Sequence, residues 1–283
     1  MNYRHAYHAG NFADVFKHCL WYQCLSYLQQ KDTPYFVLDS HGGIGLYELT
    51  GEQASKTAEW QQGIARVIDD SQAPALMQPY LDAVRLMNRD NMSLRWYPGS
   101  PLLTSALLRD QDRAVVCELH PEDGPALAQN LGRSHAHRVH LGDGYQALKH
   151  YLPPQQKRGI VLIDPPFEKP DEFSAMLAAI KVHVKQWRHA SMALWYPIKD
   201  PLAIATFQQQ IAAIPQLAKT LAVDFCVREA NTDRGLHGCG MILVNPAYGV
   251  VQSLPQWLPY LTERLAQGPG ARWDSRWLVA DAD

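Results

Sequence analysis

A short polar and aromatic motif follows a strongly apolar run in the second half of the chain. Asp164, Pro165, Pro166 and Phe167 come directly after GIVLI. The two prolines fix the backbone and remove two N–H donors, so carbonyls remain free to accept hydrogen bonds. Asp164 adds an acceptor and Phe167 a flat apolar face, a combination that suits a planar heterocycle with an exocyclic NH2 group. The alternative interpretation is a rigid turn in which Asp164 satisfies local backbone amides.

A glycine-rich turn follows the apolar run YFVLD near the N-terminus. Its sequence, HGGIG, begins at His41, and its glycines let a ligand approach the backbone closely. The spacing departs from GxGxxG, so a plain tight turn explains it equally well in isolation. The segment PGSP at residues 98–101 predicts a helix start, with Ser100 at the N-cap and Pro101 at the first helical position. A helix N-terminus there would attract a carboxylate, such as the amino-acid end of a cofactor.

Acidic residues end two further predicted strands. Glu118 ends the strand in AVVCELH, 18 residues after Ser100, where an acid commonly binds ribose hydroxyls. Asp143 and Gly144 follow the strand in HRVHLGD, and Asp143 offers an acceptor for an adenine amino group. Each acid alone is equally well a solvated strand end. Several such ends in register predict a single ligand site at one edge of the sheet.

Polar residues are concentrated near the N-terminus. Tyr3 can stack on a nucleobase, and Arg4 and Lys17 can contact phosphates. His5 and His8 have HxxH spacing, but no Cys or carboxylate pair is near in sequence, so we expect no metal site. The alternative is a solvated polar N-terminus followed by one amphipathic helix.

Strands alternating with helices must position these residues. Asn11 is a plausible N-cap for a helix that ends at about Gln30, and the first strand is Tyr35 to Asp39. The runs AVVCELH, HRVHLGD and RGIVLID repeat the strand pattern, and a helical segment follows each of them. This alternation predicts a doubly wound α/β sheet with right-handed crossovers.

Three more runs, SMALWYPI, LAVDFCVRE and CGMILVNP, bring the predicted strands to seven. A loop joins the last two, which predicts an antiparallel hairpin at the edge of the sheet. Residues 46–97 contain two helical segments, around residues 52–68 and 74–87, that interrupt the alternation. We interpret them as a helical subdomain inserted into a domain made of residues 1–45 and 98–283.

Composition and charge limit the classes of protein. The chain has 283 residues, 26 Lys or Arg and 28 Asp or Glu, so it is no bulk-basic coat for nucleic acid. Five cysteines without CxxC spacing fit a reducing compartment. No apolar run reaches the roughly 18 residues of a membrane span, and no signal core is present. We therefore expect a soluble, cytoplasmic protein without a membrane partner.

These motifs resemble those of the class I S-adenosylmethionine-dependent amino-methyltransferases, whose motif [DNS]PP[YFW] is DPPF in this chain. More closely, the chain resembles the ribosomal RNA large subunit methyltransferase J family, which methylates an adenine N6 of 23S rRNA. The similarity is carried from end to end by YRHAYHAGNFADVFKH, LDSHGGIG, WYPGSPLL, CELHP, DGYQALK, LIDPPF, LWYP and GMILVNP. It implies S-adenosylmethionine as cofactor and a Rossmann-like, mostly parallel seven-stranded sheet. Helices would cover both faces of this sheet, with a small helical insertion.

The resemblance also implies roles for individual residues. Catalysis would use Asp164, Pro165 and Phe167, and 23S rRNA would contact Tyr3, Arg4, Lys17 and Phe167. Cofactor contacts would be made by His18, His41, Ser100, Glu118, Asp143, Gly144 and Asp164. Phe167 replaces the more usual Tyr of the motif and Gly43 a familiar Ala, which keeps the stacking face and the loop shape. No metal or protein partner is implied, and we expect a monomer.

Two other functions remain open from the sequence. A metal-dependent nuclease acting on external DNA could use Asp39, Glu118, Asp143 and Asp164 as Mg2+ ligands, because the family has been tied to the use of external DNA. These acids end different strands, however, and none is followed by the Lys of common nuclease motifs. A non-catalytic nucleic-acid-binding module is the second alternative, and it would not bind the cofactor.

Overall fold

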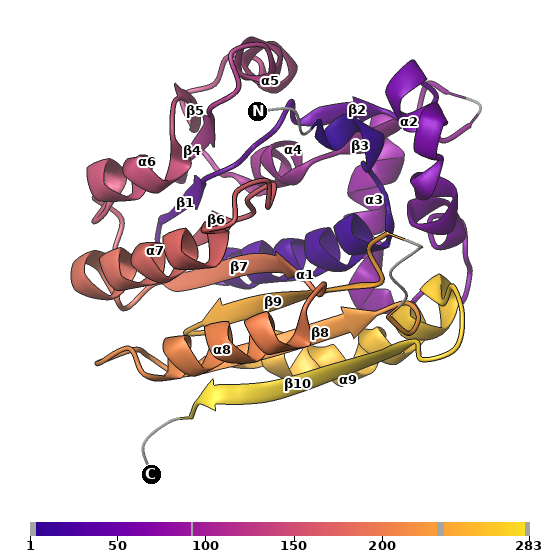
Figure 1. Cartoon of the computed structure of the whole chain (residues 1–283). Helices are drawn as coiled ribbons and strands as arrows, with labels where there is room; N and C mark the ends of the chain where they lie inside the picture. Colours follow the sequence, from indigo (N-terminus) through magenta and orange to yellow (C-terminus); the bar gives the residue numbers. More distant parts are fainter. Residues whose placement is uncertain (1–3, 92, 231–234, 281–283) are drawn as a thin grey trace.

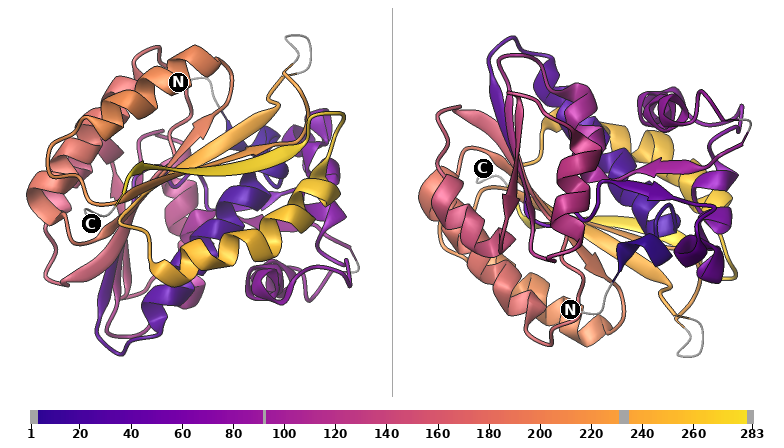
Figure 2. Two further views of the ribbon diagram at one scale, coloured as in Figure 1. Left: turned by 90° about the horizontal axis from the view of Figure 1, so that it is seen from below. Right: turned by 90° about the horizontal axis from the view of Figure 1, so that it is seen from above.

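The computed structural model describes residues 4–91, 93–230 and 235–280. An eight-stranded sheet forms its centre, with helices on both faces (Figures 1 and 2). The strands of this sheet are β1 (Tyr35–Asp39), β4 (Arg113–Glu118), β5 (His137–Leu141), β6 (Arg158–Ile163), β7 (Ser191–Pro197), β8 (Thr220–Cys226), β9 (Gly238–Val244) and β10 (Arg272–Val279). The helices are α1 (Phe12–Gln29), α2 (Glu52–Thr57), α3 (Gln78–Met87), α4 (Ser100–Leu107), α5 (Asp123–Leu131), α6 (Gly144–Tyr151), α7 (Glu172–Trp187), α8 (Pro201–Ala212) and α9 (Tyr248–Leu265).

The strand order is β10-β8-β9-β7-β6-β1-β4-β5. Strands β5, β4, β1, β6 and β7 pair in parallel, and β9 runs antiparallel to both β7 and β8. Strand β8 is therefore parallel to β7. Numbered along the chain, the six parallel strands follow the order 3-2-1-4-5-6 of the Rossmann fold. The predicted α/β fold class is confirmed.

The sequence predicts seven strands, whereas the sheet has eight, and the predicted hairpin does not form the edge of the sheet. Strands β8 and β9 do form the predicted antiparallel hairpin, but β10 pairs with β8 and forms the edge instead. Most residues of RWDSRWLV in β10 are exposed or only half-buried. A strand of this kind has no apolar run to reveal it, because its main-chain pairing rather than side-chain burial places it.

Side chains of each central strand alternate between two cores. In β1, Val37 packs with α1, α9 and the helices of residues 46–97, whereas Phe36 and Leu38 pack with α6, α7 and α8. Both layers are visible in Figure 2. Burial on both faces explains why the strand reads as an unbroken apolar run. None of the helices in the described parts of the chain combines the length and apolarity needed to cross a membrane.

Two helix predictions need correction. Helix α4 begins with Ser100 as its first residue, Pro101 is second, and Gly99 is the N-cap without a side-chain cap bond. The helix predicted near residues 52–68 is broken, because α2 ends before Ala58, whose φ of 51° is left-handed. Short 3-10 turns follow it, η2 (Glu59–Gln62) and η3 (Ile64–Arg66).

A second, two-stranded sheet lies at the two ends of segment 46–97. Strand β2 (Leu46–Glu48) pairs antiparallel with β3 (Trp96–Pro98), so the chain returns beside its point of departure. Between them lie α2, α3 and 3-10 turns, the last of which is η4 (Ala75–Met77). Tyr80 and Ile64 from this segment share one core with α1.

Candidate active site

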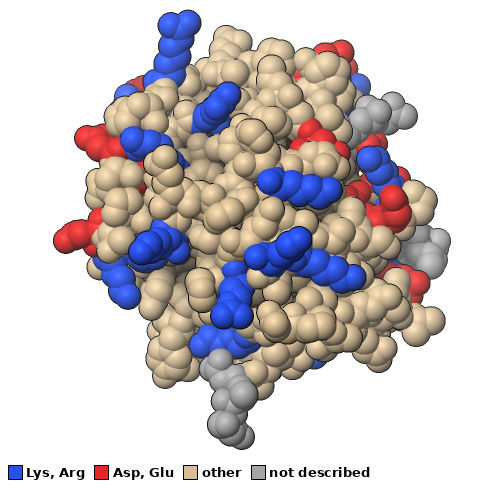
Figure 3. All heavy atoms as spheres, turned by 90° about the vertical axis from the view of Figure 1, so that its left-hand side faces the viewer, with Lys and Arg blue, Asp and Glu red and all other residues tan. Residues whose placement is uncertain are grey.

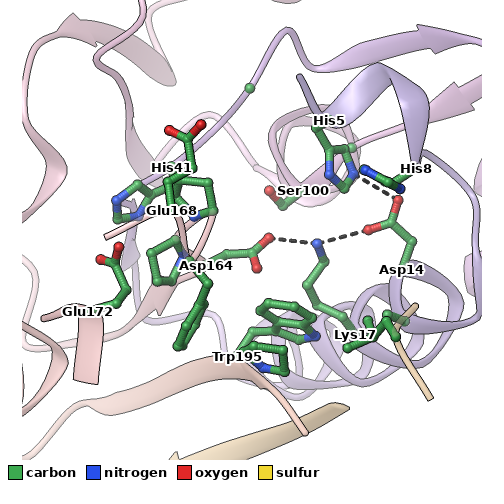
Figure 4. A pocket seen from close by; sticks show the side chains of 18 of the residues that line it. His5, His8, Asp14, Lys17, His41, Ser100, Asp164, Glu168, Glu172 and Trp195 are labelled. Carbon is green, nitrogen blue, oxygen red and sulfur yellow. Dashed lines mark hydrogen bonds and ion pairs between the residues drawn. The ribbon is translucent and has the colours of Figure 1, made fainter. Parts of the chain in front are cut away.

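A cavity of about 1060 Å3 opens at the carboxyl ends of the parallel strands, between the sheet and the N-terminal half of α1. This size accommodates a cofactor together with part of a second molecule. The predicted site residues that line it are Lys17, His18, His41, Ser100, Glu118, Asp143, Gly144, Asp164, Pro165 and Phe167. Residues from α1, α4 and the carboxyl ends of β1, β4, β5 and β6 thus meet in one space, and several are shown in Figure 4.

Two ion pairs connect Asp14, Lys17 and Asp164 in a row along the cavity. Lys17 Nζ lies 2.6 Å from Asp164 Oδ2 and 2.9 Å from Asp14 Oδ1 (Figure 4). The side chains of Lys17 and Asp14 are buried, and that of Asp164 is nearly so. Burial alone would lower the pKa of Lys17, but Asp14 and Asp164 outweigh it and raise that pKa well above its ordinary value. Lys17 is therefore a fixed cation that orients the Asp164 carboxylate.

Asp14 is a member of this site that our sequence reasoning missed. Burial would raise the pKa of Asp14, but His5 and Lys17 overcome it and hold the pKa well below its ordinary range. Its Oδ2 atom lies 2.9 Å from His5 Nε2. The available signal was helical spacing, since Asp14 precedes Lys17 by three residues and shares its face of α1.

The DPPF motif forms the wall opposite α1. Phe167 has a φ of 52°, a left-handed conformation that is uncommon for a bulky residue and concentrates at functional sites. Its ring makes edge contacts with Phe173 at 5.2 Å and with Trp195 at 5.9 Å between centroids. These neighbours fix the ring beside Asp164, and Trp195 also lines the cavity.

The glycine turn and the acid of β4 are joined directly. The Glu118 carboxylate accepts the N–H of Gly43 at 2.8 Å and that of His120 at 2.7 Å. Burial raises the pKa of Glu118, and these N–H donors oppose that rise. The carboxylate is thus held by backbone donors while it still borders the cavity, where its remaining lone pairs can accept hydroxyl protons.

Asp143 and Gly144 lie at the start of α6. Asp143 is the N-cap, and its Oδ1 accepts the amides of Tyr145 at 2.8 Å and Gln146 at 3.2 Å. At Gly144 a Cβ atom would lie 1.9 Å from the Ser40 carbonyl oxygen, so only glycine fits. The close approach brings the ends of β1 and β5 together at the cavity.

The Ser100 hydroxyl forms a hydrogen bond with the last residue of β1 rather than capping its own helix. Its Oγ donates to Asp39 Oδ2 at 2.7 Å, which explains why it is not the cap of α4. Burial raises the pKa of Asp39 to about 7, and the bond from Ser100 opposes this rise. Ser100 still lines the cavity.

Two histidines in the wall are neutral at physiological pH because burial lowers their pKa values, that of His41 to about 4. His41 Nδ1 lies 2.6 Å from Ser40 Oγ, and its ring meets that of Tyr145 edge-on at 5.2 Å. His18 Nδ1 lies 2.7 Å from the Tyr97 hydroxyl. Tyr145 and Tyr97 were not singled out in the sequence, although they stand in the segments DGYQALK and WYPGSPLL.

The two residues predicted to contact phosphates have carboxylate partners. Arg4 forms ion pairs with Glu122 and Asp123 at the start of α5, so carboxylates rather than phosphates surround it. Tyr3 falls outside the described residues. Lys17, predicted to contact phosphate, is buried between two carboxylates.

Among the described residues no three His, Cys, Asp or Glu side chains are grouped so that they could hold a metal ion. His5 and His8 contact different acids, Asp14 and Glu59. The nuclease interpretation therefore gains no support.

Comparison with known proteins agrees with this geometry. Ribosomal RNA large subunit methyltransferase J of Escherichia coli is 36% identical over 281 residues, covering 99% of this chain and all of the relative. Its counterpart in Haemophilus influenzae is 34% identical over 287 residues with the same coverage. The crystal structure of protein LPL1258 from Legionella pneumophila is 31% identical and matches with a TM-score of 0.83, covering 95% of this chain and 97% of that one. A family model matches residues 32–279, and the chain belongs to that family, described as Ribosomal RNA large subunit methyltransferase D, RlmJ.

Proposed function

We propose that this protein transfers the methyl group of S-adenosylmethionine to the N6 amino group of an adenine in 23S rRNA. The observation that carries the proposal is the position of Asp164 and the DPPF motif. They share one cavity with Glu118 and Asp143, at the carboxyl ends of β6, β4 and β5. Relatives that match over their full length are named ribosomal RNA methyltransferases, which supports the RNA substrate.

The residues on the β1, β4 and β5 side fit the methyl donor. Glu118 would accept the ribose hydroxyls and Asp143 the adenine amino group, while Ser100 and the first turn of α4 face the amino-acid end. The missing side chain of Gly144 lets its backbone lie against the Ser40 carbonyl, which holds the ends of β1 and β5 together on this side of the cavity. His18 and His41 would complete the wall as neutral side chains. When bound, the donor supplies an electrophilic methyl group on a sulfonium.

Asp164, Pro165 and Phe167 would hold the acceptor base. The N6 lone pair of adenine is delocalised into the ring, so the amino group is a poor nucleophile at rest. Hydrogen bonds from its two N–H groups to Asp164 and the Pro165 carbonyl would favour a pyramidal nitrogen and aim its lone pair at the methyl group. Stacking on Phe167 would fix the ring, and Lys17 keeps the carboxylate in place.

Proton transfer follows bond formation. As N6 bonds to the methyl carbon and the S–CH3 bond breaks, the nitrogen becomes positively charged and its proton acidic. Asp164 then accepts that proton or passes it to water. The adenine must leave its stack to reach the cavity, which costs least in a loop or an unpaired site. Positioning therefore supplies most of the acceleration.

The subdomain and the assembly state are part of the proposal. Segment 46–97 would be an inserted subdomain that supports the site wall, since Tyr47 and Glu59 border the cavity. We propose that the protein works as a cytoplasmic monomer. Light scattering during size-exclusion chromatography tests the assembly state, and a dimer with shared sites would contradict it.

The direct test is methylation of an unmodified 23S rRNA transcript with S-adenosylmethionine, followed by mass spectrometry of the nucleosides. We expect one N6-methyladenosine per transcript, and no product with Asp164→Ala although that variant still binds the cofactor in calorimetry. A parallel incubation with DNA and Mg2+ tests the nuclease alternative. Cleavage of DNA, or full turnover by Asp164→Ala, would overturn the proposal.

A further inference from the structure

Positive side chains lie at the amino ends of the parallel strands, along the edge of the sheet opposite the cavity. Each of the six parallel strands is entered through a segment that carries at least one Lys or Arg. Taken in the order β8, β7, β6, β1, β4 and β5, one from each segment are Lys219, Arg188, Lys157, Lys31, Arg113 and Arg133. We call these side chains the basic edge. Strands β7, β6, β1, β4 and β5 are neighbours, and β9 alone separates β8 from β7, so the topology places residues from 31 to 219 in one row.

The two edges of the sheet differ in charge. The segments that lead into the parallel strands contain eight Lys or Arg and three Asp; they are 30–34, 108–113, 132–137, 152–158, 188–191 and 213–220. The segments after the first five of these strands contain two Lys and six acids; they are 40–45, 119–122, 142–143, 164–171 and 198–200. The chain as a whole has more acids than bases. The positive charge is therefore concentrated on the edge away from the proposed cofactor site.

Two arginines beside β1 are held rigidly, Arg113 of the basic edge and Arg158, which follows Lys157 in the sequence. Arg158 pairs in register with Tyr35, and Arg113 with Phe36, so they flank β1 on both sides. Arg158 donates to the carbonyls of Thr33 and Leu28, each at 2.9 Å, and Arg113 donates to two carbonyls of its own loop at 2.6 and 2.7 Å. These bonds fix the guanidinium groups without cancelling their charge.

Several positions of the row are open to solvent. Lys31, Lys157 and Arg188 are exposed. Figure 3 shows Lys and Arg side chains across the middle of one side of the molecule, with acids mostly at its margins. At about 4.8 Å between strands, the six steps from β8 to β5 span about 29 Å. This is long enough for several consecutive phosphates of one nucleic-acid strand.

We infer that the basic edge is a second RNA-binding surface, which holds phosphates of the 23S rRNA outside the stretch that enters the cavity. The inference rests on the proposed function, because the same RNA must reach both edges. Strands of five or six residues separate the edges by about 20 Å, so only a folded RNA that extends around the protein can contact both. Phosphate contacts of this kind position a substrate without reading its sequence.

The test compares a long and a short substrate. The variant is Lys31→Glu/Lys157→Glu/Arg188→Glu, and the substrates are the full 23S rRNA transcript and the shortest fragment of it that is still methylated. For the full transcript we expect Kd and KM to rise about tenfold or more at 0.1 M salt, with a slope of log K against log salt reduced by about 2–3. For the short fragment, kcat/KM should stay at the wild-type value, as should cofactor affinity.

The matched control is Lys56→Glu/Arg66→Glu/Arg89→Glu, which makes the same charge change at exposed positions of segment 46–97. It should leave the salt slope unchanged. An equal loss in this control, an equal loss with the short fragment, or an unchanged slope in the edge variant would overturn the inference. Binding of the wild type to anionic phospholipid vesicles that is lost in the edge variant, without any loss of RNA binding, would assign the edge to a membrane surface and also overturn it.

Failure of the proposed function gives a different result. If the wild type methylates neither RNA, the function fails, while filter binding of the full transcript still measures the basic edge independently. If methylation proceeds and the edge variant binds the full transcript as the wild type does, only this inference fails.

Discussion

Replacing Asp164 by Asn tests how the site presents its acceptor. Lys17 Nζ lies 2.6 Å from Oδ2 and can only donate, so the new amide must turn its oxygen toward Lys17. Its NH2 group then occupies the position of Oδ1 and meets the N–H donor of the adenine. Loss of one such preorganised contact costs about 10²–10³-fold in rate, and we expect a fall of at least this order in kcat/KM.

The loss should occur in a folded protein. In Asp164→Asn, Lys17 keeps its ion pair with Asp14 at 2.9 Å. The free energy of unfolding should therefore fall by less than the roughly 3–5 kcal/mol typical of a broken buried pair. Single-turnover transfer of a tritiated methyl group to unmodified 23S rRNA measures the chemistry, and calorimetry measures cofactor affinity, which should be unchanged.

Two further variants separate this explanation from simple damage to the loop. Asp171→Asn makes the same change at an exposed position of that loop and should be fully active. In Lys17→Met/Asp164→Asn no donor holds the amide, so its oxygen can turn to the substrate and recover roughly tenfold over Asp164→Asn, the value of about one hydrogen bond. Near-normal turnover by Asp164→Asn, or a double variant that is less active than Asp164→Asn, would contradict this role of Lys17 and Asp164.

Three other predictions concern stability and the cofactor. Lys17→Met leaves two acids without their shared cation and should lower the free energy of unfolding by about 3–5 kcal/mol in urea titrations at pH 7; a loss below about 1 kcal/mol would show that the pair is not effectively buried. The pKa of Asp39 is about 7 in the folded protein against an ordinary value of 3.8. Asp39 therefore stabilises the folded state fully below pH 3.8, and this contribution is lost as the pH rises to about 7. Asp39→Asn should therefore flatten the fall in stability between pH 4 and 8, by on the order of 4 kcal/mol at most, and an unaltered pH profile would contradict this. Gly144→Ala forces a Cβ to within 1.9 Å of the Ser40 carbonyl oxygen and should abolish cofactor binding in calorimetry, whereas Gly268→Ala, with 3.5 Å of clearance, should bind normally; equal binding by both would disprove the tight approach.

Much of the framework could be predicted from the pattern of residues. The central strands β1 and β6 are largely apolar because both faces of the sheet are covered. The runs YFVLD and RGIVLID can therefore be recognised as strands from the sequence alone. Asn11 caps α1 as expected, since a cap bond to Asp14 is local in the chain. Glu118, Asp143 and Asp164 border one cavity, because parallel strands bring their carboxyl ends to one edge of the sheet.

Other features depend on contacts that no local pattern encodes. Strand β10 exists because its main chain pairs with β8, although its side chains are mostly exposed. Ser100 has the sequence context of a cap, yet its hydroxyl bonds to Asp39, 61 positions earlier. Arg4 was expected near phosphate and is paired with acids of the β4–α5 region instead.

The residue pattern alone thus predicts the central strands, their burial on both faces and the residue types of the site, because these follow from hydrophobic periodicity and local capping. Only the tertiary structure decided which partner each charged group has. Lys17 and Asp164 are 147 positions apart but 2.6 Å apart in space. Ion pairing and desolvation act over a few ångströms, so they depend on how the chain packs rather than on the order of its residues.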